Sequence, residues 1–272
     1  MMQKMTSHSN IYLQKAIIED ESFVWSYSRL KKYEDCKYAW YLTYMENCED
    51  EGLFFSQYGS FIHDLYCKVL MGELPSERAY ETYLSEFREK VSAPAPTPAI
   101  FSKYFSDGLM ATKKMNDFYF KIISEFEIMG VEIKVDFNFG DKNFVGFIDL
   151  LLKDEKGNYI IVDHKSKTIK PKETKVIDKY TRQLYVYAEA VKQKYGKYPK
   201  ELWLHCFRNE ENDIIKTPFD LEKLPQTAKI FNEMINEIAN TEKWTPNINP
   251  FYCKNLCGCN KYCDYYQMMK GH

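Results

Sequence analysis

The 272-residue sequence predicts an α/β fold: a mixed β-sheet flanked by helices, with a helical N-terminal region and a C-terminal cysteine metal clasp. Up to residue 125, apolar residues recur at three- and four-residue spacing, which is the period of an amphipathic helix. From residue 131 onward, polar and apolar residues alternate in short segments separated by turns, as in half-buried strands. Four of the eight cysteines lie between residues 253 and 263, which indicates metal ligation in a chain without an export signal.

The N-terminal part is expected to contain four helices. Ser26 or Ser28 is suited to cap the first helix, and the prolines of SAPAPTP at 92–98 end the third because they forbid helical backbone. The expected ranges are 26–44, 56–71, 76–90 and 100–125.

The middle of the chain is expected to form the sheet. VEIKVDFNF, FVGFIDLLL and YIIVDHK are joined by short turns, so they predict an antiparallel meander. The expected strands are 131–139, 144–152, 159–165, 201–207 and 212–217, and the expected helices are 176–195 and 220–240.

Composition excludes several classes of protein. A hydrophobic fraction of 45% and a charged fraction of 28% are typical of a globular chain. No apolar run approaches the roughly 18 residues that span a bilayer, and no secretory signal follows the start of the chain. The formal net charge of −2 argues against a globally basic nucleic-acid binder, so any site for a polyanion must be local.

Two acidic residues and a lysine mark the expected strands. Asp163 and Lys165 are two residues apart, so their side chains leave the same face of one strand, and Asp149 lies on the strand expected to pair with it. Paired carboxylates bind hard cations such as Mg²⁺ or Mn²⁺. A lysine beside them can orient or deprotonate water and offset charge on a phosphate. Taken alone, Asp163 and Lys165 fit a surface salt bridge at least as well.

Five motifs in order resemble the PD-(D/E)XK nuclease superfamily, in particular its RecB-like branch. That branch includes the RecB nuclease domain, AddB-type proteins and the CRISPR-adaptation exonucleases. Besides Gly-x-Ile-Asp and Asp-x-Lys, the motifs are SYSRL at 26–30 followed by WYL at 40–42, Gly59-x-x-x-His63, and Gln183-x-x-x-Tyr187. The resemblance runs from about residue 25 to 265 and implies a restriction-endonuclease-like core.

The resemblance also implies a role for each matching residue. The divalent cation would be held by His63, Asp149, Asp163 and the backbone carbonyl of His164. Lys165 would be the catalytic lysine, and Gln183 and Tyr187, one helical turn apart, would contact water at the metal or the DNA backbone.

Three positions call for separate comment. His164 stands where the branch more often has tyrosine, and Ser166 stands where threonine is common; neither changes a catalytic side chain. Glu132 in the first strand could add a carboxylate, but a charge on the solvent face of that strand is the favoured interpretation.

Iron–sulfur members of the branch hold a [4Fe–4S] cluster with one cysteine in the first helix and three near the C-terminus. The resemblance implies the same cofactor here, with Cys36 in the first place. The spacing of FYCKNLCGCNKYC favours Cys253, Cys257 and Cys263 for the other places, with Cys259 as the alternate. A zinc site made by the four cysteines of the tail is the alternative. Free structural cysteines are expected at Cys48, Cys67 and Cys206.

A basic segment follows Lys165. From residue 165 to 182 there are seven basic and two acidic residues, in a chain that is net acidic. Positive charge at this place would bind phosphates on either side of a scissile bond; a solvated lysine-rich loop is the alternative. The expected DNA-binding side chains are Lys167, Lys170, Lys172, Lys175, Lys179 and Arg182.

Together these features predict a Mg²⁺- or Mn²⁺-dependent deoxyribonuclease. We expect an exonuclease for single-stranded DNA or DNA ends, in recombination, repair, phage replication or CRISPR spacer processing, in the cytoplasm of a bacterium, an archaeon or a phage-infected cell. The alternatives are a catalytically idle DNA-binding or assembly module, and the nuclease subunit of a helicase–nuclease complex. The chain lacks the phosphate-binding motif Gly-x-x-x-x-Gly-Lys-Ser/Thr, so a helicase motor would be a separate chain.

The expected organisation runs along the chain in four parts. A flexible N-terminus at 1–24 precedes a helical region at 25–125 that contributes Cys36 and His63. The nuclease core follows at 126–240, and the cysteine clasp occupies 241–272.

Overall fold

The computed structural model describes residues 18, 20 and 23–270, so most of the N-terminus expected at 1–24 lies outside the described residues. The chain divides into two compact units, each built from separate stretches of sequence. The sheet unit contains Gly52–Val135 and Phe147–Leu221, and the cysteine unit contains Met1–Glu51, Asp136–Gly146 and Glu222–His272. Among the described residues, no helix has both the length and the apolar character that crossing a membrane requires.

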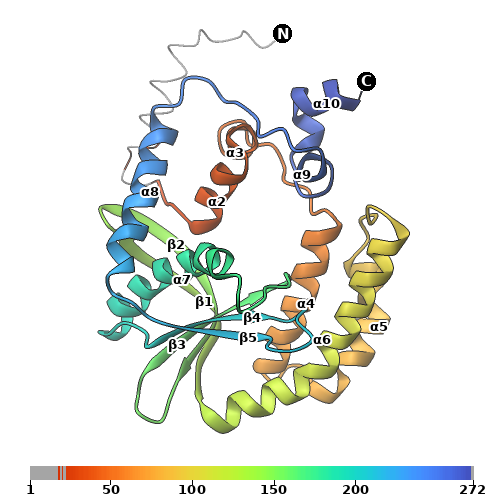
Figure 1. The fold of residues 1–272 in the computed structure, drawn as a ribbon, viewed down its shortest axis with the longest axis vertical. Helices are drawn as coiled ribbons and strands as arrows, with labels where there is room; N and C mark the ends of the chain where they lie inside the picture. Colours follow the sequence, from red (N-terminus) through yellow and green to blue (C-terminus); the bar gives the residue numbers. More distant parts are fainter. Residues whose placement is uncertain (1–17, 19, 21–22, 271–272) are drawn as a thin grey trace. The chain divides into compact units, whose positions relative to one another are not determined.

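The predicted mixed sheet is confirmed, with five strands in chain order across it (Figure 1). β2 pairs antiparallel with β3, β3 pairs parallel with β4, and β4 pairs antiparallel with β5. The parallel pair needs a long crossover, which the helix α7 (Thr174–Tyr195) provides. The strands are β1 (Glu127–Phe139), β2 (Lys142–Lys153), β3 (Tyr159–Lys165), β4 (Glu201–Cys206) and β5 (Ile214–Pro218).

Helices cover both faces of the sheet within the sheet unit. One buried apolar cluster joins the first face of the sheet to the helices that follow Gly52. From the sheet it includes Leu150, Val162 and Trp203. Successive strand residues point to opposite faces, so Asp163 and Lys165 face the other side, where α7 packs against β3 and β4. The helices of the first face are α4 (Phe54–Leu70), η1 (Ser76–Arg78), α5 (Ala79–Lys90) and α6 (Pro98–Glu125).

Local sequence explains where these helices begin and end. The Thr97 hydroxyl accepts a hydrogen bond from the Ile100 amide at 3.2 Å. Pro98 in the first turn lacks an amide hydrogen, so it leaves no donor unpaired there. α7 ends at Gly196, whose φ of 82° lies in the left-handed region that favours glycine. Both boundaries fall within two residues of the prediction.

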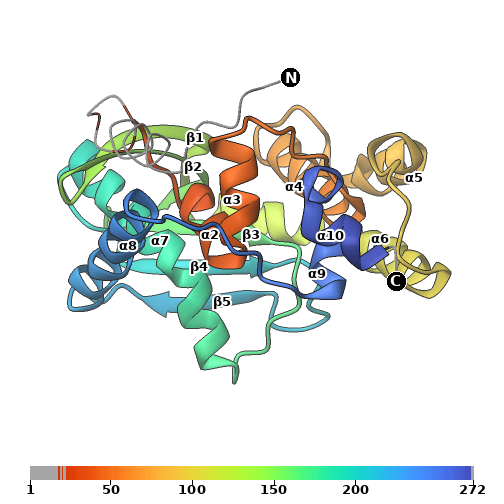
Figure 2. The ribbon, with the colours of Figure 1, turned by 90° about the horizontal axis from the view of Figure 1, so that it is seen from above.

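The cysteine unit contains short helices and the β1–β2 turn. Within it α2 packs against α8 (Figure 2), and the Trp40 ring stacks on Trp244 with 5.3 Å between centroids. The helices are α2 (Tyr27–Asp35), α3 (Lys37–Tyr44), α8 (Lys223–Ala239), α9 (Pro250–Asn255), η2 (Asn260–Tyr262) and α10 (Asp264–Lys270).

The prediction of a single helix over 26–44 is wrong, because the helix is interrupted at Cys36. Cys36 has an extended backbone (φ −162°, ψ 112°), and its amide still closes the end of α2 by donating to the Lys32 carbonyl. Its sulfur accepts from the Ala39 amide at 3.4 Å and so caps α3. The apolar period continues across this one-residue break, so periodicity alone does not reveal it. Ser26 is the cap of α2, as one of the two expected candidates.

The remaining elements agree with the prediction apart from their ends. The first strand begins at Glu127, four residues before the expected start, and the third helix opens with the 3₁₀ turn η1.

Candidate active site

The middle of β2 and the end of β3 bring Asp149, Asp163 and Lys165 together. The register pairs Leu150 with Val162, so one further step places Asp149 beside Asp163. The His164 amide donates to Asp149 Oδ2 at 2.7 Å, and Lys165 Nζ lies 2.6 Å from Asp163 Oδ2. Asp163 is only 3% exposed, so this ion pair is a buried one rather than the surface salt bridge that the sequence left open.

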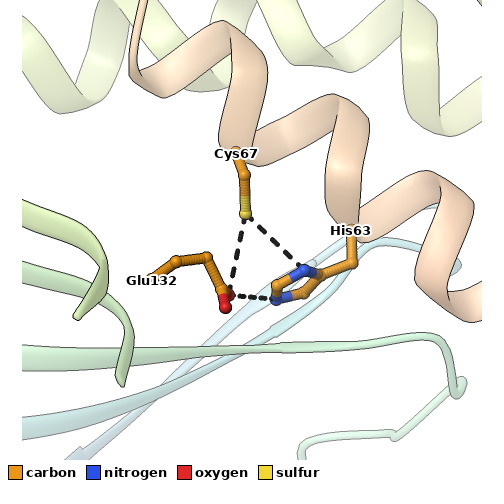
Figure 3. Close-up of side chains that lie close together, drawn as sticks. All are labelled: His63, Cys67 and Glu132. Carbon is orange, nitrogen blue, oxygen red and sulfur yellow. Dashed lines mark hydrogen bonds and ion pairs between the residues drawn. The ribbon is translucent and has the colours of Figure 1, made fainter. Parts of the chain in front are cut away.

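His63 approaches these carboxylates from α4. Its Nε2 lies 3.2 Å from Asp149 Oδ2. The same nitrogen lies 3.3 Å from Glu132 Oε1 (Figure 3). Glu132 is exposed, as the solvent-facing interpretation expects, and its carboxylate also reaches His63. Its φ of 51° lies in the left-handed region, which is unusual for a residue other than glycine inside a strand.

Cys67 also lies at this cluster, and sequence reasoning gave it only a structural role. It follows His63 by one turn of α4, and its sulfur lies 3.6 Å from His63 Nδ1 and 3.8 Å from Glu132 Oε1 (Figure 3). The spacing His63-x-x-x-Cys67 was the available signal, because residues four apart share one face of a helix.

Gln183 and Tyr187 reach the cluster from α7. Lys165 Nζ donates to Gln183 Oε1 at 2.9 Å, and Gln183 Nε2 donates to the Tyr187 hydroxyl at 3.3 Å. A hydrogen-bonded chain therefore runs from Tyr187 through Gln183 and Lys165 to the Asp163 carboxylate.

The imidazole of His164 points into the core. Its Nδ1 lies 2.8 Å from Nδ1 of His205, the residue opposite it in the parallel β3–β4 pair, and its ring stacks on Tyr66. Burial is the main cause that lowers the pKa of both imidazoles, that of His205 to about 3. Both rings are therefore neutral near pH 7. Because the imidazole of His164 points into the core, its backbone carbonyl is the group of this residue that is suited to bind a cation.

Burial and charge together set the protonation of the cluster. Burial raises the pKa of Asp163 to about 7, although the Lys165 charge opposes it. Burial lowers the pKa of His63, but hydrogen bonds to Asp149 and Cys67 outweigh it and raise the pKa to about 11. Burial likewise lowers the pKa of Lys165, and the Asp163 charge reverses the shift. Protonated His63 and Lys165 thus balance the carboxylates in the absence of a metal.

The donor set fits a hard divalent cation. Carboxylate oxygens of Asp149 and Glu132 converge on His63 Nε2, and Asp163 lies on the neighbouring strand. Mg²⁺ and Mn²⁺ prefer carboxylate and carbonyl oxygens, and imidazole is a common further ligand of transition metals. His63, Asp149, Asp163 and the His164 carbonyl, the ligands that the resemblance implies, therefore lie near one another.

The sequence profile of the PD-(D/E)XK nuclease superfamily matches residues 24–267, which is nearly the whole chain. The chain belongs to this superfamily. The fold agrees with that membership, because the mixed sheet flanked by helices carries the Asp-x-Lys motif at the end of β3.

Two known proteins are similar to the chain. The chain is 26% identical over 173 residues to an ATP-dependent helicase/nuclease subunit from Desulforamulus reducens, with 59% of this chain and 14% of that protein covered. The chain thus spans about a seventh of that relative. A crystal structure of a candidate exonuclease from Eubacterium rectale matches with a TM-score of 0.50 and 15% identity over the whole of both chains. At that identity the likeness shows the fold alone.

The basic segment of this nuclease-superfamily chain leads from β3 into α7. Lys170 and Lys172 line a hollow of about 550 Å³. Arg208 also lines it, but this guanidinium pairs with Asp107 at 2.6 Å and lies over the Tyr104 ring, so its charge is already used. The Lys167 ammonium lies over the Tyr180 ring. Lys175, Lys179 and Arg182 lie on the first turns of α7, and Arg182 is the half-buried member of the segment.

The cysteine unit gathers the cysteines that the sequence assigns to a clasp. Cys36, Cys257 and Cys259 share one buried apolar cluster, and Cys48 and Cys263 pack against it. Asn247 links the two sides of this cysteine cluster, because its amide donates to Cys36 Sγ at 3.4 Å and its carbonyl lies 3.8 Å from Cys253 Sγ.

Cys259, the alternate ligand, is the most buried of these cysteines. It is fully buried, and its sulfur lies 3.0 Å from the Thr43 hydroxyl. A hydrogen bond with Cys257 lowers the pKa of Cys259 to about 6, against the effect of burial. The same contact raises the pKa of Cys257. A thiolate therefore forms readily at Cys259.

Proposed function

We propose that the chain is a Mg²⁺- or Mn²⁺-dependent deoxyribonuclease that acts as an exonuclease on single-stranded DNA or DNA ends. Its main support is that His63, Asp149, Asp163 and Lys165 come from three elements and meet at one place. That arrangement combines a cation site with a lysine, which are the two parts that hydrolysis of a phosphodiester requires.

The cation would be held by His63, Asp149, Asp163 and the His164 carbonyl, with Glu132 as a further carboxylate. When bound, it lowers the pKa of a water and neutralises negative charge on the phosphate. The ordered carboxylates need little rearrangement for this, because Asp149 is already held by the His164 amide at 2.7 Å.

Lys165 is the residue we assign to the reacting water. Its ammonium is held by Asp163 on one side and by Gln183 at 2.9 Å on the other, so its position is fixed before substrate arrives. It would orient the attacking water and offset the charge that develops on the phosphate. Gln183 and Tyr187 would keep the ammonium directed at the phosphate. The exposed lysines between residues 167 and 179, together with Arg182, would bind flanking phosphates.

For the cysteine unit we propose a structural [4Fe–4S] cluster held by Cys36, Cys253, Cys257 and Cys263, with Cys259 as the alternate. In tetrahedral zinc sites the Zn–S bond is about 2.3 Å, which puts sulfurs about 3.8 Å apart. Among the described residues, no three cysteine sulfurs lie within 4.8 Å of one another. This spacing favours a cluster, whose four thiolates bind different irons and lie farther apart, over a zinc ion.

A helicase partner is a proposal that rests on the matched relative. That protein is named as a helicase/nuclease subunit, and this chain corresponds to a small part of it. We therefore propose that a separate helicase, or a partner of recombination or CRISPR adaptation, delivers DNA to this chain in the cytoplasm.

The test is degradation of end-labelled single-stranded DNA by protein purified without oxygen. Wild type is compared with Asp163→Ala and Lys165→Ala in Mg²⁺, in Mn²⁺ and in EDTA. Asp117→Asn and Lys121→Ala are matched controls, since both residues are exposed on α6. We expect cation-dependent release of nucleotides in wild type and controls, and a loss of about 10³-fold or more in both site variants.

Several outcomes would change the proposal. Cleavage of circular as well as linear DNA would replace exonuclease with endonuclease activity. Binding of DNA without cleavage of either substrate, in any of the cations, would instead identify a catalytically idle binding module.

A further inference from the structure

The proposed reaction leaves Cys67 without a role, although its thiol faces the cluster. The residue is 3% exposed on α4 and directs its sulfur at His63 and Glu132 (Figure 3). Neither Mg²⁺ nor Mn²⁺ has a use for a sulfur ligand, because both prefer oxygen. A thiol in this place therefore suits a different kind of cation.

The spacing of the donors fits a tetrahedral ion. One ligand atom from each of His63, Cys67 and Glu132 can be chosen so that all three lie within 4.8 Å of one another. Cys67 Sγ lies 3.6 Å from His63 Nδ1 and 3.8 Å from Glu132 Oε1, whereas Oε1 lies 3.3 Å from the other ring nitrogen, Nε2. Only one of the two nitrogens can bind the ion, and the remaining distance to that nitrogen is at most 4.8 Å. Zinc bonds of about 2.0–2.3 Å place tetrahedral donors about 3.4–3.6 Å apart.

The backbone of Glu132 holds its carboxylate toward this place. A φ of 51° at a residue other than glycine costs roughly 1–2 kcal/mol, and the strand keeps it nonetheless. Such backbone outliers concentrate at functional sites. Asp149 Oδ2 lies 3.2 Å from His63 Nε2, but it is not among the donors that all lie within 4.8 Å of one another, so its side chain would have to move to supply a fourth donor.

We propose that His63, Cys67 and Glu132, with Asp149, form a binding site for a thiophilic divalent cation such as Zn²⁺. A thiolate and an imidazole select zinc strongly over magnesium. On binding, Zn–S and Zn–N bonds form, and the thiol proton of Cys67 and the imidazolium proton of His63 pass to solvent. No electron is transferred in this step.

Zinc bound in this way would inhibit the nuclease. With Asp149 moved in as the fourth donor, four protein donors would complete a tetrahedral shell and leave no open position for water, as in structural zinc sites. His63 and Asp149 are also ligands of the proposed catalytic cation, so the two ions exclude each other. This consequence rests on the proposed function, whereas the binding of zinc itself does not.

The test uses Co²⁺ as a spectroscopic substitute for Zn²⁺. Full-length protein purified without oxygen is titrated with Co²⁺ and then with competing Zn²⁺, and thiolate-to-cobalt absorption is followed in the near ultraviolet. Wild type is compared with Cys67→Ser and with Cys206→Ser, a matched control for a fully buried cysteine on β4. Glu132→Gln is a second variant, and since its side chain is 40% exposed we expect it to fold normally.

We expect wild type and Cys206→Ser to bind one Co²⁺ that Cys67→Ser does not bind, and Glu132→Gln to bind it more weakly. Loss of an outer-shell partner lowers metal affinity by up to roughly 100-fold. Cys67→Ser removes a direct ligand, so the Zn²⁺ concentration that half-inhibits cleavage should rise by more than that factor. Equal Co²⁺ spectra and affinities for all four proteins would overturn the site. If Co²⁺ binds as expected but no cation supports DNA cleavage, the site stands and the nuclease proposal fails.

Discussion

The proposed catalytic cluster of the sheet unit and the cysteine cluster of the cysteine unit draw their proposed ligands from different kinds of structure. Asp149, Asp163 and Lys165 lie on paired strands, so the register fixes their spacing and hydrogen bonds hold their side chains. Cys36 caps a helix, and the other cysteines lie on or beside the one- and two-turn elements α9 and η2. Short helices are marginal by themselves. The carboxylates should therefore keep their geometry without a metal, whereas the cysteine unit should depend on one.

Removing one cysteine ligand gives the largest expected effect. Serine is a good helix cap, so Cys36→Ser keeps the start of α3 and removes a metal ligand. We expect iron and the visible absorption of the cluster to be lost, and the thermal midpoint of unfolding to fall sharply, since structural metal sites contribute about 10–16 kcal/mol in small zinc domains. Metal content is measured by elemental analysis.

Cys206→Ser is the control for this prediction, because Cys206 lies on β4 in the sheet unit. Retention of a full complement of iron by Cys36→Ser would remove Cys36 from the ligand set. Stoichiometric zinc in place of iron would establish the zinc alternative.

Gln183→Ala tests how far hydrogen bonds fix the position of Lys165 before substrate binds. The variant removes the 2.9 Å hydrogen bond that restrains Lys165 Nζ. A misplaced catalytic group costs about 10²-fold in rate, so we expect kcat to fall by about that factor with little change in KM. Gln193→Ala, on the exposed side of the same helix, is the matched control. A wild-type kcat for Gln183→Ala would show that Asp163 alone positions the lysine.

The buried pair His164–His205 predicts a loss of stability in acid. The pKa of His205 is lowered to about 3, below its ordinary value of 6.5, mainly by burial. The unfolded chain therefore binds more protons than the folded chain below pH 6.5, and stability falls as the pH falls. Between pH 6.5 and 5 this residue alone accounts for about 2 kcal/mol.

The matching experiment compares the free energy of unfolding of wild type and His205→Gln by denaturant titration at pH 8, 6.5 and 5. Glutamine keeps a hydrogen-bonding group but does not titrate in this range. We expect the variant to lose less stability between pH 6.5 and 5 than wild type. If the free energies of unfolding of the two proteins changed equally with pH, His205 would bind its proton as readily in the folded protein as in the unfolded chain.

The sequence predicted which residues meet at the proposed catalytic cluster better than the details around it. Asp163 and Lys165 share a strand face because the side-chain period of a strand is two, and that rule needs no tertiary information. The antiparallel meander of the first three strands followed from the short turns, and the end of the third helix followed from the prolines. The partnership of His164 with His205 did not, because it depends on the register of a parallel pair separated by α7.

Local backbone exceptions account for the other misses. The break at Cys36 and the left-handed φ of Glu132 each involve a single residue, and patterns averaged over a window do not detect them. Cys67 was missed for a different reason. Its spacing from His63 was visible, but a buried cysteine is usually a small apolar side chain, and the distances to His63 and Glu132 are what separate the two interpretations.

The smallest expected effect concerns the lysines, and it tests whether DNA follows the catalytic cluster. Lys170→Ala and Lys172→Ala remove exposed charges that line the hollow after β3. Lys254→Ala removes an exposed charge on α9 in the cysteine unit.

Binding of single-stranded DNA is measured in EDTA, where cleavage is absent, across a series of salt concentrations. Each phosphate contact contributes roughly one to the slope of log affinity against log salt. We expect that slope to become shallower by about one for each of the first two variants and to stay unchanged for Lys254→Ala, because the phosphates next to the scissile bond must lie beside Lys165. An equal change in all three variants would mean that the cysteine unit also binds the strand, and the metal in that unit would then help to build the DNA-binding surface as well as stabilise the fold.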